Sequence, residues 1–408
     1  MTERNWAGNH VYRATRLHRP ATLDELRRIV AGTPRIRVLG SRHSFNDIAD
    51  SAELVSLAGL PADVTIDRAA GTVSSGGATT YGELAGVLDA AGLALHNLAS
   101  LPHISVAGAV ATGTHGSGDA SGSLATAVAA LELVTSDGDV LTAARGDADF
   151  DGLVVGLGAL GAVTRLTLDV EPAYAVRQRV FEALGWDALL EHFDAISASG
   201  DSVSVFTRWG ETVDQVWVKQ RAGDAPETFR AELFGARAAT VERHPILGLD
   251  PVNCTAQLGV PGPWWDRLPH FRMGFTPSSG DELQSEFLLP REHAAAAIGA
   301  LRPLADRLRP VLLVCELRTV AADGLWMSPA YGRASVGIHF TWRQEPERVA
   351  RALAGVEAAL APFDARPHWG KGFHAAPRYE RAADFADLRA RLDPRGAFRN
   401  AWLDAHLG

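Results

Sequence analysis

The sequence is poor in cysteine and contains no long apolar run, and each shortage excludes a class of protein. Two cysteines, Cys254 and Cys315, are too few for a disulfide scaffold or a zinc cluster. Nowhere do the roughly 18 uninterrupted apolar residues of a membrane-spanning helix occur, and the amino terminus lacks the apolar segment of a secretion signal. We therefore expect a cytoplasmic protein with no disulfide framework, no metal site and no membrane partner.

Dense runs of basic residues are also missing, although the chain carries 39 Lys and Arg residues against 48 Asp and Glu residues. The formal net charge of −9 and the scattered cations argue against a nucleic-acid or anionic membrane surface. A small molecule is the expected partner. No pattern decides the oligomeric state, for which a monomer is our working expectation.

The 408 residues are enough for two or three domains, and 47% hydrophobic with 21% charged residues is a globular composition. Helix and strand patterns alternate as far as Pro172, whereas the next segment is dominated by alternating strands. Helix and turn patterns return near Arg366. The sequence therefore predicts an α+β protein with one domain from 1–172, to which 366–408 return, and a second from 173–365.

Short motifs predict individual elements of the first domain. Thr22 and Thr80 are each followed by Glu three residues later, the capping-box spacing that begins a helix. Residues 131–142 have the pattern of a hairpin around an Asp-Gly turn. The segment 104–123, ISVAGAVATGTHGSGDASGS, is so rich in small and polar residues that we predict an irregular, ligand-cradling loop.

One stretch matches a dinucleotide fingerprint in its letters but not in its context. Gly156, Gly158 and Gly161 spell G-x-G-x-x-G. The fingerprint requires a helix at the third glycine and an acidic residue about 20 positions later, whereas here a period-2 strand over 162–170 follows. We interpret this stretch as a helix-to-strand turn.

The segment from Ser100 to Gly118 is better suited to holding a phosphate. Glycines without a Cβ let the backbone approach an anion closely, and hydroxyl side chains add donors. The contributing residues are the glycines Gly108, Gly113, Gly116 and Gly118 and the hydroxyl residues Ser105, Thr112 and Thr114. A Gly/Ser-rich surface loop is the alternative interpretation.

A histidine occupies an unusual place in VLGSRHSFND, residues 38–47. His43 stands in a turn of small residues directly after an apparent buried strand, 35–39. A helix pattern precedes this strand, so the turn closes a helix–strand unit. These residues alone leave open why an imidazole stands there.

Three predicted strands of the middle segment each place two polar side chains on one face, because side chains two apart point the same way. The pairs are Gln284 with Glu286, Glu316 with Arg318, and His339 with Thr341. Bulky apolar residues flank them, so these faces fit a pocket for a ligand with many hydroxyls, which would pair the buried polar groups. A solvated face with surface ion pairs is the alternative.

Together these stretches resemble the flavoproteins of the vanillyl-alcohol-oxidase type, and most closely the bacterial alditol oxidases. The resemblance runs from end to end and rests on the ordered motifs NWAGN, GSRHSFNDIA, NLASLPHISVAGAVATGTHGSG, VNCTAQLGVPGPW, PSSGDELQSEFLLPREH, CELRTVAAD, SPAYGR, HFTW and RPHWGK. It implies an α+β fold of two domains: an FAD-binding domain and a substrate domain with a large antiparallel sheet.

The resemblance also implies FAD as the cofactor, bonded covalently through a ring nitrogen of His43 to the flavin 8-methyl carbon. Related flavoproteins usually have glycine just before this histidine, whereas this chain has Arg42. The implied FAD-binding residues are Leu39, Gly40, Ser41, Arg42, His43, Ser44, Phe45, Ser100, Ser105, Gly108, Thr112, Gly113, Thr114, His115 and Val163.

The implied reaction oxidises the terminal hydroxyl of an alditol, such as xylitol or sorbitol, to the aldose, with O2 reduced to H2O2. The expected substrate contacts are Ser100, Gln284, Glu316, Arg318, Thr341 and Lys371. The expected catalytic residues are Glu316 and Arg318, which hold hydroxyls, and Lys371 and His339, either of which is a candidate base. Two alternatives stay open: a sugar-1,4-lactone oxidase or dehydrogenase of the same fold, and a non-catalytic flavin- or sugar-binding protein.

Overall fold

The computed structural model describes residues 3–223, 230–275 and 282–407. Residues 277–281 of the PSSGDELQ motif therefore lie outside the described residues. Near the amino terminus a parallel sheet has the strand order β1-β3-β2. Its elements are β1 Arg16–His18, α1 Leu23–Gly32, β2 Ile36–Val38 and β3 Glu53–Val55. Strand β2 leads directly into the His43 turn.

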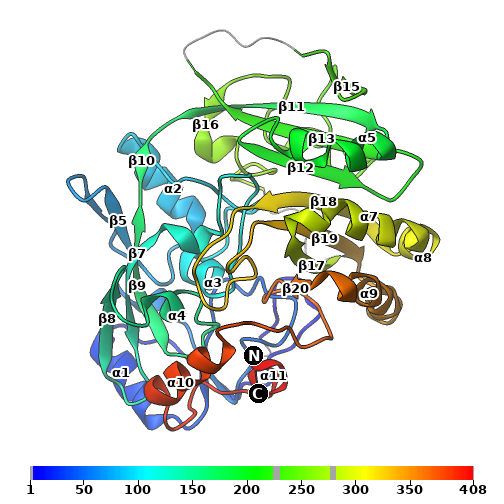
Figure 1. Ribbon diagram of the computed structural model, residues 1–408. Helices are drawn as coiled ribbons and strands as arrows, with labels where there is room; N and C mark the ends of the chain where they lie inside the picture. Colours follow the sequence, from blue (N-terminus) through cyan, green and yellow to red (C-terminus); the bar gives the residue numbers. More distant parts are fainter. Residues whose placement is uncertain (1–2, 224–229, 276–281, 408) are drawn as a thin grey trace.

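An antiparallel sheet follows, in the strand order β4-β5-β9-β7-β8 (Figure 1). Its strands are β4 Thr65–Asp67, β5 Thr72–Gly76, β7 Val128–Val134, β8 Val140–Ala144 and β9 Ala162–Asp169. Accompanying elements are α2 Tyr81–Ala90, α3 Val106–Ala111, α4 Phe150–Val154 and the paired β6 Leu93–Ala94 and β10 Glu171–Pro172. The predicted hairpin is β7-β8, and Thr22 and Thr80 each accept a hydrogen bond from the backbone N–H three residues later.

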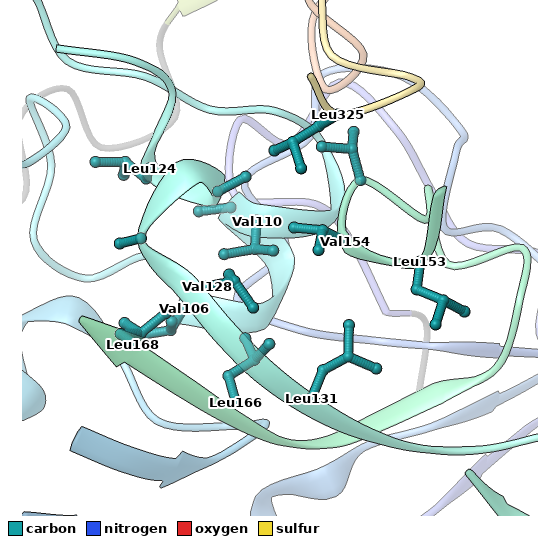
Figure 2. Packing of buried hydrophobic residues seen from close by; sticks show 14 of the residues in the cluster. Val106, Val110, Leu124, Val128, Leu131, Leu153, Val154, Leu166, Leu168 and Leu325 are labelled. Carbon is teal, nitrogen blue, oxygen red and sulfur yellow. The ribbon is translucent and has the colours of Figure 1, made fainter. Parts of the chain in front are cut away.

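The prediction of an irregular loop over 104–123 is wrong for part of that segment, because Val106–Ala111 form helix α3. Val106 and Val110, four residues apart, lie on one face of this helix and are buried. They pack into one apolar cluster with Leu131 and Leu166 of the neighbouring sheet (Figure 2). This burial stabilises a short helix that its small-residue composition does not predict.

The middle of the chain forms a large antiparallel sheet in the strand order β14-β15-β11-β13-β12-β18-β19-β17-β20, with β16 also paired to β11. Its strands are β11 Ala175–Leu184, β12 Ser202–Thr207, β13 Val213–Arg221, β14 Glu232–Leu233, β15 Ala236–Ala238, β16 Gly262–Pro263, β17 Glu282–Pro290, β18 Leu312–Val320, β19 Ser335–Arg343 and β20 Arg366–Pro367. The helices α5 Trp186–Glu191, α6 Phe193–Ser197, α7 Ala294–Leu301, α8 Ala305–Leu308 and α9 Pro346–Leu360 share an apolar cluster with it (Figure 1).

Side chains alternate across the central strands of this sheet. On β18, Cys315 and Leu317 join the apolar cluster beneath the helices, whereas Glu316 and Arg318 face a cavity on the other side. Strand β19 repeats the alternation and places His339 on the cavity side. The period-2 prediction for these strands is confirmed.

The last segment returns to the first antiparallel sheet. Helix α10, Ala382–Leu392, contacts α4, and α11, Ala401–Leu407, adds Trp402 and Leu403 to the cluster that contains α2 and α3. The division into domains at residues 172 and 366 stays a prediction. Among the described residues, no helix combines the length and apolar composition needed to cross a membrane.

Candidate active site

A cavity of about 820 Å³ separates the first antiparallel sheet from the polar face of the large sheet. One part of its wall comes from residues 37–45, from α3 and from the turn before β9. The other part comes from β17, β18, β19 and the segment after β20. The cavity therefore joins two groups of predicted site residues that are far apart in the sequence.

The turn after β2 contains a left-handed residue, and this chain places Arg42 there with a φ of 65°. Glycine adopts this conformation without steric cost, whereas a residue with a Cβ does not favour it. The Arg42 guanidinium pairs with Glu3 at 2.9 Å. The backbone N–H of Trp6 donates to the Arg42 carbonyl, and Asn5 Nδ2 donates to the carbonyl of Ser44. Contacts with the amino-terminal segment thus hold the turn in this conformation, although arginine stands where related flavoproteins usually have glycine.

The His43 imidazole lines the cavity and stacks on the Trp6 indole, with ring centroids 4.9 Å apart. Its centroid lies 6.4 Å from that of His103. Burial, with a contribution from His103, lowers the pKa of His43 to about 4. At neutral pH the ring is therefore neutral, and one of its nitrogens keeps a lone pair that can act as a nucleophile.

Helix α3 brings a hydroxyl without a protein partner to the cavity. Ser105, the N-cap of α3, is buried, and its Oγ has no hydrogen-bond partner among the described residues. A Cβ on Gly40 or Gly108 would lie 2.9 or 2.7 Å from this oxygen. Because buried polar groups are normally paired, the hydroxyl and its closely approaching backbone fit a polar ligand.

The turn with Gly156, Gly158 and Gly161 joins α4 to β9, as the sequence predicts, and also lines the cavity. Gly158 has a φ of 62°, and a Cβ on Gly161 would lie 2.6 Å from the Val134 carbonyl oxygen. Packing against β7 therefore explains Gly161, and the left-handed backbone explains Gly158. A strand follows where a dinucleotide fingerprint needs a helix.

Glu316 and Arg318 are the polar centre of the large sheet's cavity face and are 4% and 6% exposed. Arg318 Nε lies 3.6 Å from Glu316 Oε2, too far for a direct hydrogen bond, and has no hydrogen-bond partner among the described residues. Glu316 Oε1 instead lies 3.0 Å from His270 Nε2. Burial opposes ionisation, but Arg318 and His270 outweigh it and hold the pKa of Glu316 below its ordinary value.

Glu286, on β17, connects the cations of the site. Its Oε1 accepts from Arg318 at 2.6 Å and lies 3.3 Å from His115 Nε2, while its Oε2 accepts from Lys371 Nζ. Burial opposes ionisation here too, but Arg318, Lys371 and His115 hold the pKa of Glu286 well below its ordinary value. This carboxylate therefore compensates two buried cations and fixes their positions relative to each other.

Lys371 and His339 form a second linked pair. Lys371 Nζ donates to His339 Nδ1 at 2.7 Å, and His339 Nε2 lies 3.0 Å from Thr341 Oγ1. Burial lowers the pKa of Lys371, and burial together with Lys371 lowers the pKa of His339 to about 4. Because Lys371 donates to Nδ1, we assign the ring proton to Nε2, which donates to Thr341. The Thr341 hydroxyl proton is then available to the cavity.

The predicted site residues converge on this cavity. Its wall includes every predicted FAD-binding residue except Gly113, and also all the predicted substrate contacts and His339. Gly113 instead terminates α3 in the left-handed conformation, with a φ of 64°.

Three residues at the cavity were left out of the predicted site. Glu286 shares a strand face with Gln284, so its period-2 position was available from the sequence, but its two cationic partners come from other segments. His270 comes from a loop in which no local pattern marks it. His368 lies inside the RPHWGK motif, and burial lowers its pKa well below the ordinary value.

Comparisons with known proteins define the class. A family model described as an FAD binding domain matches residues 14–144, and one described as D-arabinono-1,4-lactone oxidase matches residues 281–406. The crystal structure of cholesterol oxidase from B. sterolicum has a TM-score of 0.79 at 15% identity and covers 100% of this chain and 96% of that chain. The protein is thus a flavoprotein with the predicted α+β fold, and the predicted fold class is confirmed.

Sequence relatives narrow this class. The alditol oxidase of Streptomyces sp. (strain IKD472 / FERM P-14339) is 50% identical over 409 residues, 98% of this chain and 97% of that protein. The L-gulono-1,4-lactone dehydrogenase of Mycobacterium tuberculosis (strain ATCC 25618 / H37Rv) is 28% identical, over 99% of this chain and 98% of that protein. The chain belongs to the alditol oxidase family, as its motifs predicted.

The cavity residues fit FAD. The Ser105 hydroxyl and the adjoining glycines suit a phosphate-containing group, because a hydroxyl can donate and the bare backbone allows close approach. Leu131 and Leu166 give the same cavity an apolar wall of the kind that aromatic ring systems contact. A volume of about 820 Å³ is in the range of sites for large ligands.

Proposed function

We propose that this protein oxidises the terminal hydroxyl of linear alditols, such as xylitol and sorbitol, to the aldose, with O2 as acceptor and H2O2 as second product. The observation that carries the proposal is the 3.6 Å gap between Glu316 Oε2 and Arg318 Nε. One hydroxyl placed to one side of this pair can bridge both atoms, by donating to the carboxylate and accepting from the guanidinium. Membership of the alditol oxidase family supports the same assignment.

The remaining polar groups of the wall suit a ligand with several hydroxyls. Thr341 can donate into the cavity, and Ser100 and Gln284 line it as well. Bound FAD would supply the hydride acceptor and return the electrons to O2. The protein side chains hold the polyol in line and receive its hydroxyl proton.

His339 and Lys371 are the two groups we propose as acceptors of that proton. His339 is neutral at neutral pH because its pKa is lowered to about 4 by burial and Lys371. Lys371 accepts a proton only after losing its own, which burial favours by lowering its pKa. The Nδ1 lone pair of His339 already accepts from Lys371, so His339 can take up a proton only through the lysine: Lys371 Nζ passes a proton to Nδ1, and the resulting amine then accepts the hydroxyl proton.

We propose further that His43 carries FAD covalently. A neutral imidazole has the lone pair that such a bond requires, and the ring lies in the cavity wall against Trp6. The short, tightly held turn limits the motion of this nucleophile relative to the cavity.

Glu316→Gln tests the polyol assignment while preserving the shape of the side chain. We expect kcat/KM for xylitol to fall roughly 30- to 1000-fold, because an amide replaces the charged acceptor in a buried site. Visible flavin absorbance should be unchanged. The measurement is anaerobic reduction of the flavin in a stopped-flow instrument. Arg318→Ala is a less specific test, because Arg318 also pairs with Glu286.

Two results would overturn the proposal. A wild-type rate in Glu316→Gln would show that polyols bind elsewhere. A wild-type kcat/KM that is much higher for L-gulono-1,4-lactone than for xylitol would favour the lactone alternative.

A further inference from the structure

Only two of the 39 basic Lys and Arg residues are lysines, and both are connected to the site. Lys371 lines the cavity. Lys219, on β13, lies behind the cavity wall and is 1% exposed. A buried ammonium is costly unless its hydrogen bonds are satisfied, so its contacts indicate why it is there.

Lys219 Nζ has three acceptors around it. They are the carbonyl oxygen of Leu268, the carbonyl oxygen of Pro269 at 3.0 Å and Nδ1 of His270 at 3.2 Å. An ammonium carries three tetrahedral N–H donors and no acceptor, so this set matches it fully. A planar guanidinium does not present its donors in this arrangement.

Lys219 and Glu316 together determine which nitrogen of His270 carries the proton, since the lysine donates to Nδ1 and the carboxylate accepts from Nε2. Because the ammonium donates to Nδ1, the proton of a neutral ring is on Nε2, and Nε2 lies 3.0 Å from Glu316 Oε1. If the proton passed from Lys219 to His270, Nε2 would still donate to the same oxygen. In both arrangements Glu316 Oε1 is occupied, and Oε2 remains beside Arg318.

Packing restricts the His270 ring as well. Its centroid lies 5.4 Å from those of Phe206 and Trp217, with interplanar angles of 73° and 81°. These edge contacts define the plane in which Nε2 meets Glu316. Burial lowers the pKa of Lys219 to about 7 and that of His270 to about 4, which is consistent with a dry linkage.

We propose that Lys219 and His270 are positioning residues for Glu316. Lys219 anchors the His270 ring through Nδ1, and His270 donates from Nε2 to the carboxylate and so holds it with Oε2 presented to the substrate hydroxyl. The inference rests on the proposed function, in which Glu316 binds the polyol. Besides each other, the titratable groups facing Lys219 and His270 are Cys254, Glu316 and Arg318.

Three substitutions in the flavin-loaded protein test the linkage. Lys219→Met removes the donor, and His270→Phe keeps a ring without Nε2–H. Gln178→Leu is the matched control. Gln178 pairs with Lys219 across β11 and β13 and donates to the carbonyl of Thr255, whose backbone N–H donates to the His270 carbonyl. Among the hydrogen bonds described, Gln178 makes none to His270 itself. A purely structural role would give Lys219→Met the same effect as this control.

We expect kcat/KM for xylitol to fall about 10- to 100-fold in Lys219→Met and in His270→Phe, with unchanged flavin content. The double variant should be no worse than the more impaired single variant, because both act through one contact. Gln178→Leu should change kcat/KM by less than about threefold. Additive losses in the double variant, or equal losses in Gln178→Leu, would overturn the inference.

Nitrogen-15 NMR of the histidine rings gives a readout that does not depend on activity. The His270 signals are assigned by their loss in His270→Phe, and selective Nζ labelling gives only two lysine side-chain signals. We expect Nε2 of His270 to be protonated in the wild type, and the Nδ1 signal to shift in Lys219→Met, because this nitrogen loses its hydrogen-bond donor while Glu316 still accepts from Nε2. An unprotonated Nε2 in the wild type overturns the inference whether or not the variants fold. A shifted Nδ1 signal in Lys219→Met, together with a wild-type protein that oxidises no alditol, refutes the proposed function and keeps the linkage.

Discussion

At the level of the residue, His43 depends on neighbours from outside its own turn. Arg42 takes the left-handed conformation, which costs a residue with a Cβ roughly 1 kcal/mol. The ion pair with Glu3 and the hydrogen bonds of Trp6 and Asn5 offset this cost. The amino-terminal segment thus supports the turn that holds the proposed attachment nitrogen.

The covalent attachment is directly testable. We expect acid-precipitated wild-type protein to stay yellow, because a covalent bond survives unfolding, and His43→Ala to release its flavin. The measurement is flavin absorbance in pellet and supernatant. His103→Ala is the matched control, since its ring is a neighbour of His43 and its loss should leave the flavin in the pellet. Flavin in the supernatant of the wild type would contradict the attachment.

At the level of the element, strand β2 holds together segments from both ends of the chain. Arg37 is 3% exposed, and its guanidinium donates to carbonyl groups at distances of 2.6–2.9 Å. These carbonyls belong to Ile48, Leu157, Gly158 and Phe398. Because they lie after the His43 turn, in the glycine turn and next to α11, one side chain fixes one end of the cavity.

Removing this guanidinium should destabilise the whole fold. We expect Arg37→Met to lower the free energy of unfolding by roughly 3–5 kcal/mol, because four buried carbonyl groups lose their donor. Arg35→Met is the matched control, since Arg35 is exposed and donates to Gly396, and it should cost less than about 1 kcal/mol. Urea unfolding of both variants measures the difference. An equal loss of unfolding free energy in the two variants would show that the hydrogen bonds of Arg37 stabilise the fold no more than those of an exposed arginine.

At the level of the whole molecule, the burial of two cavity histidines makes the free energy of unfolding depend on pH. Burial is the largest cause that lowers the pKa of His270 and of His339 from 6.5 to about 4. Between these values the unfolded chain binds a proton at each histidine and the folded protein does not. The free energy of unfolding therefore falls as the pH drops from about 6.5 to about 4, and these groups add no slope above that window.

This pH effect can be assigned to one histidine. Each group contributes a slope of about 1.4 kcal/mol per pH unit when the unfolded chain is fully protonated there. We expect His270→Phe to remove one such slope between pH 6.5 and pH 4. Urea unfolding of wild type and variant across this window tests the assignment. Parallel pH profiles for the two proteins would be inconsistent with a neutral His270 in the fold.

Local patterns were sufficient for much of the fold and for part of the site. The shared face of Glu316 and Arg318 follows from the period of a strand, and the hydroxyl of Thr80 begins its helix, because both depend only on backbone geometry over a few residues. The ordered motifs were sufficient to predict the family to which the chain belongs. The small residues of α3 led to the wrong prediction of an irregular loop, because that helix is stabilised by tertiary packing and not by its composition.

Other parts of the site depend on which distant segments meet. Glu286 acquires its role only where β17 brings it to Arg318 and Lys371, and Lys219 reaches Glu316 only through a loop residue, His270. Strand order and burial create these contacts, and neither is encoded in a short stretch of sequence. The amino-acid sequence therefore specified the chemistry available to this protein, whereas tertiary packing decided which charges are buried together and so which groups act on one another.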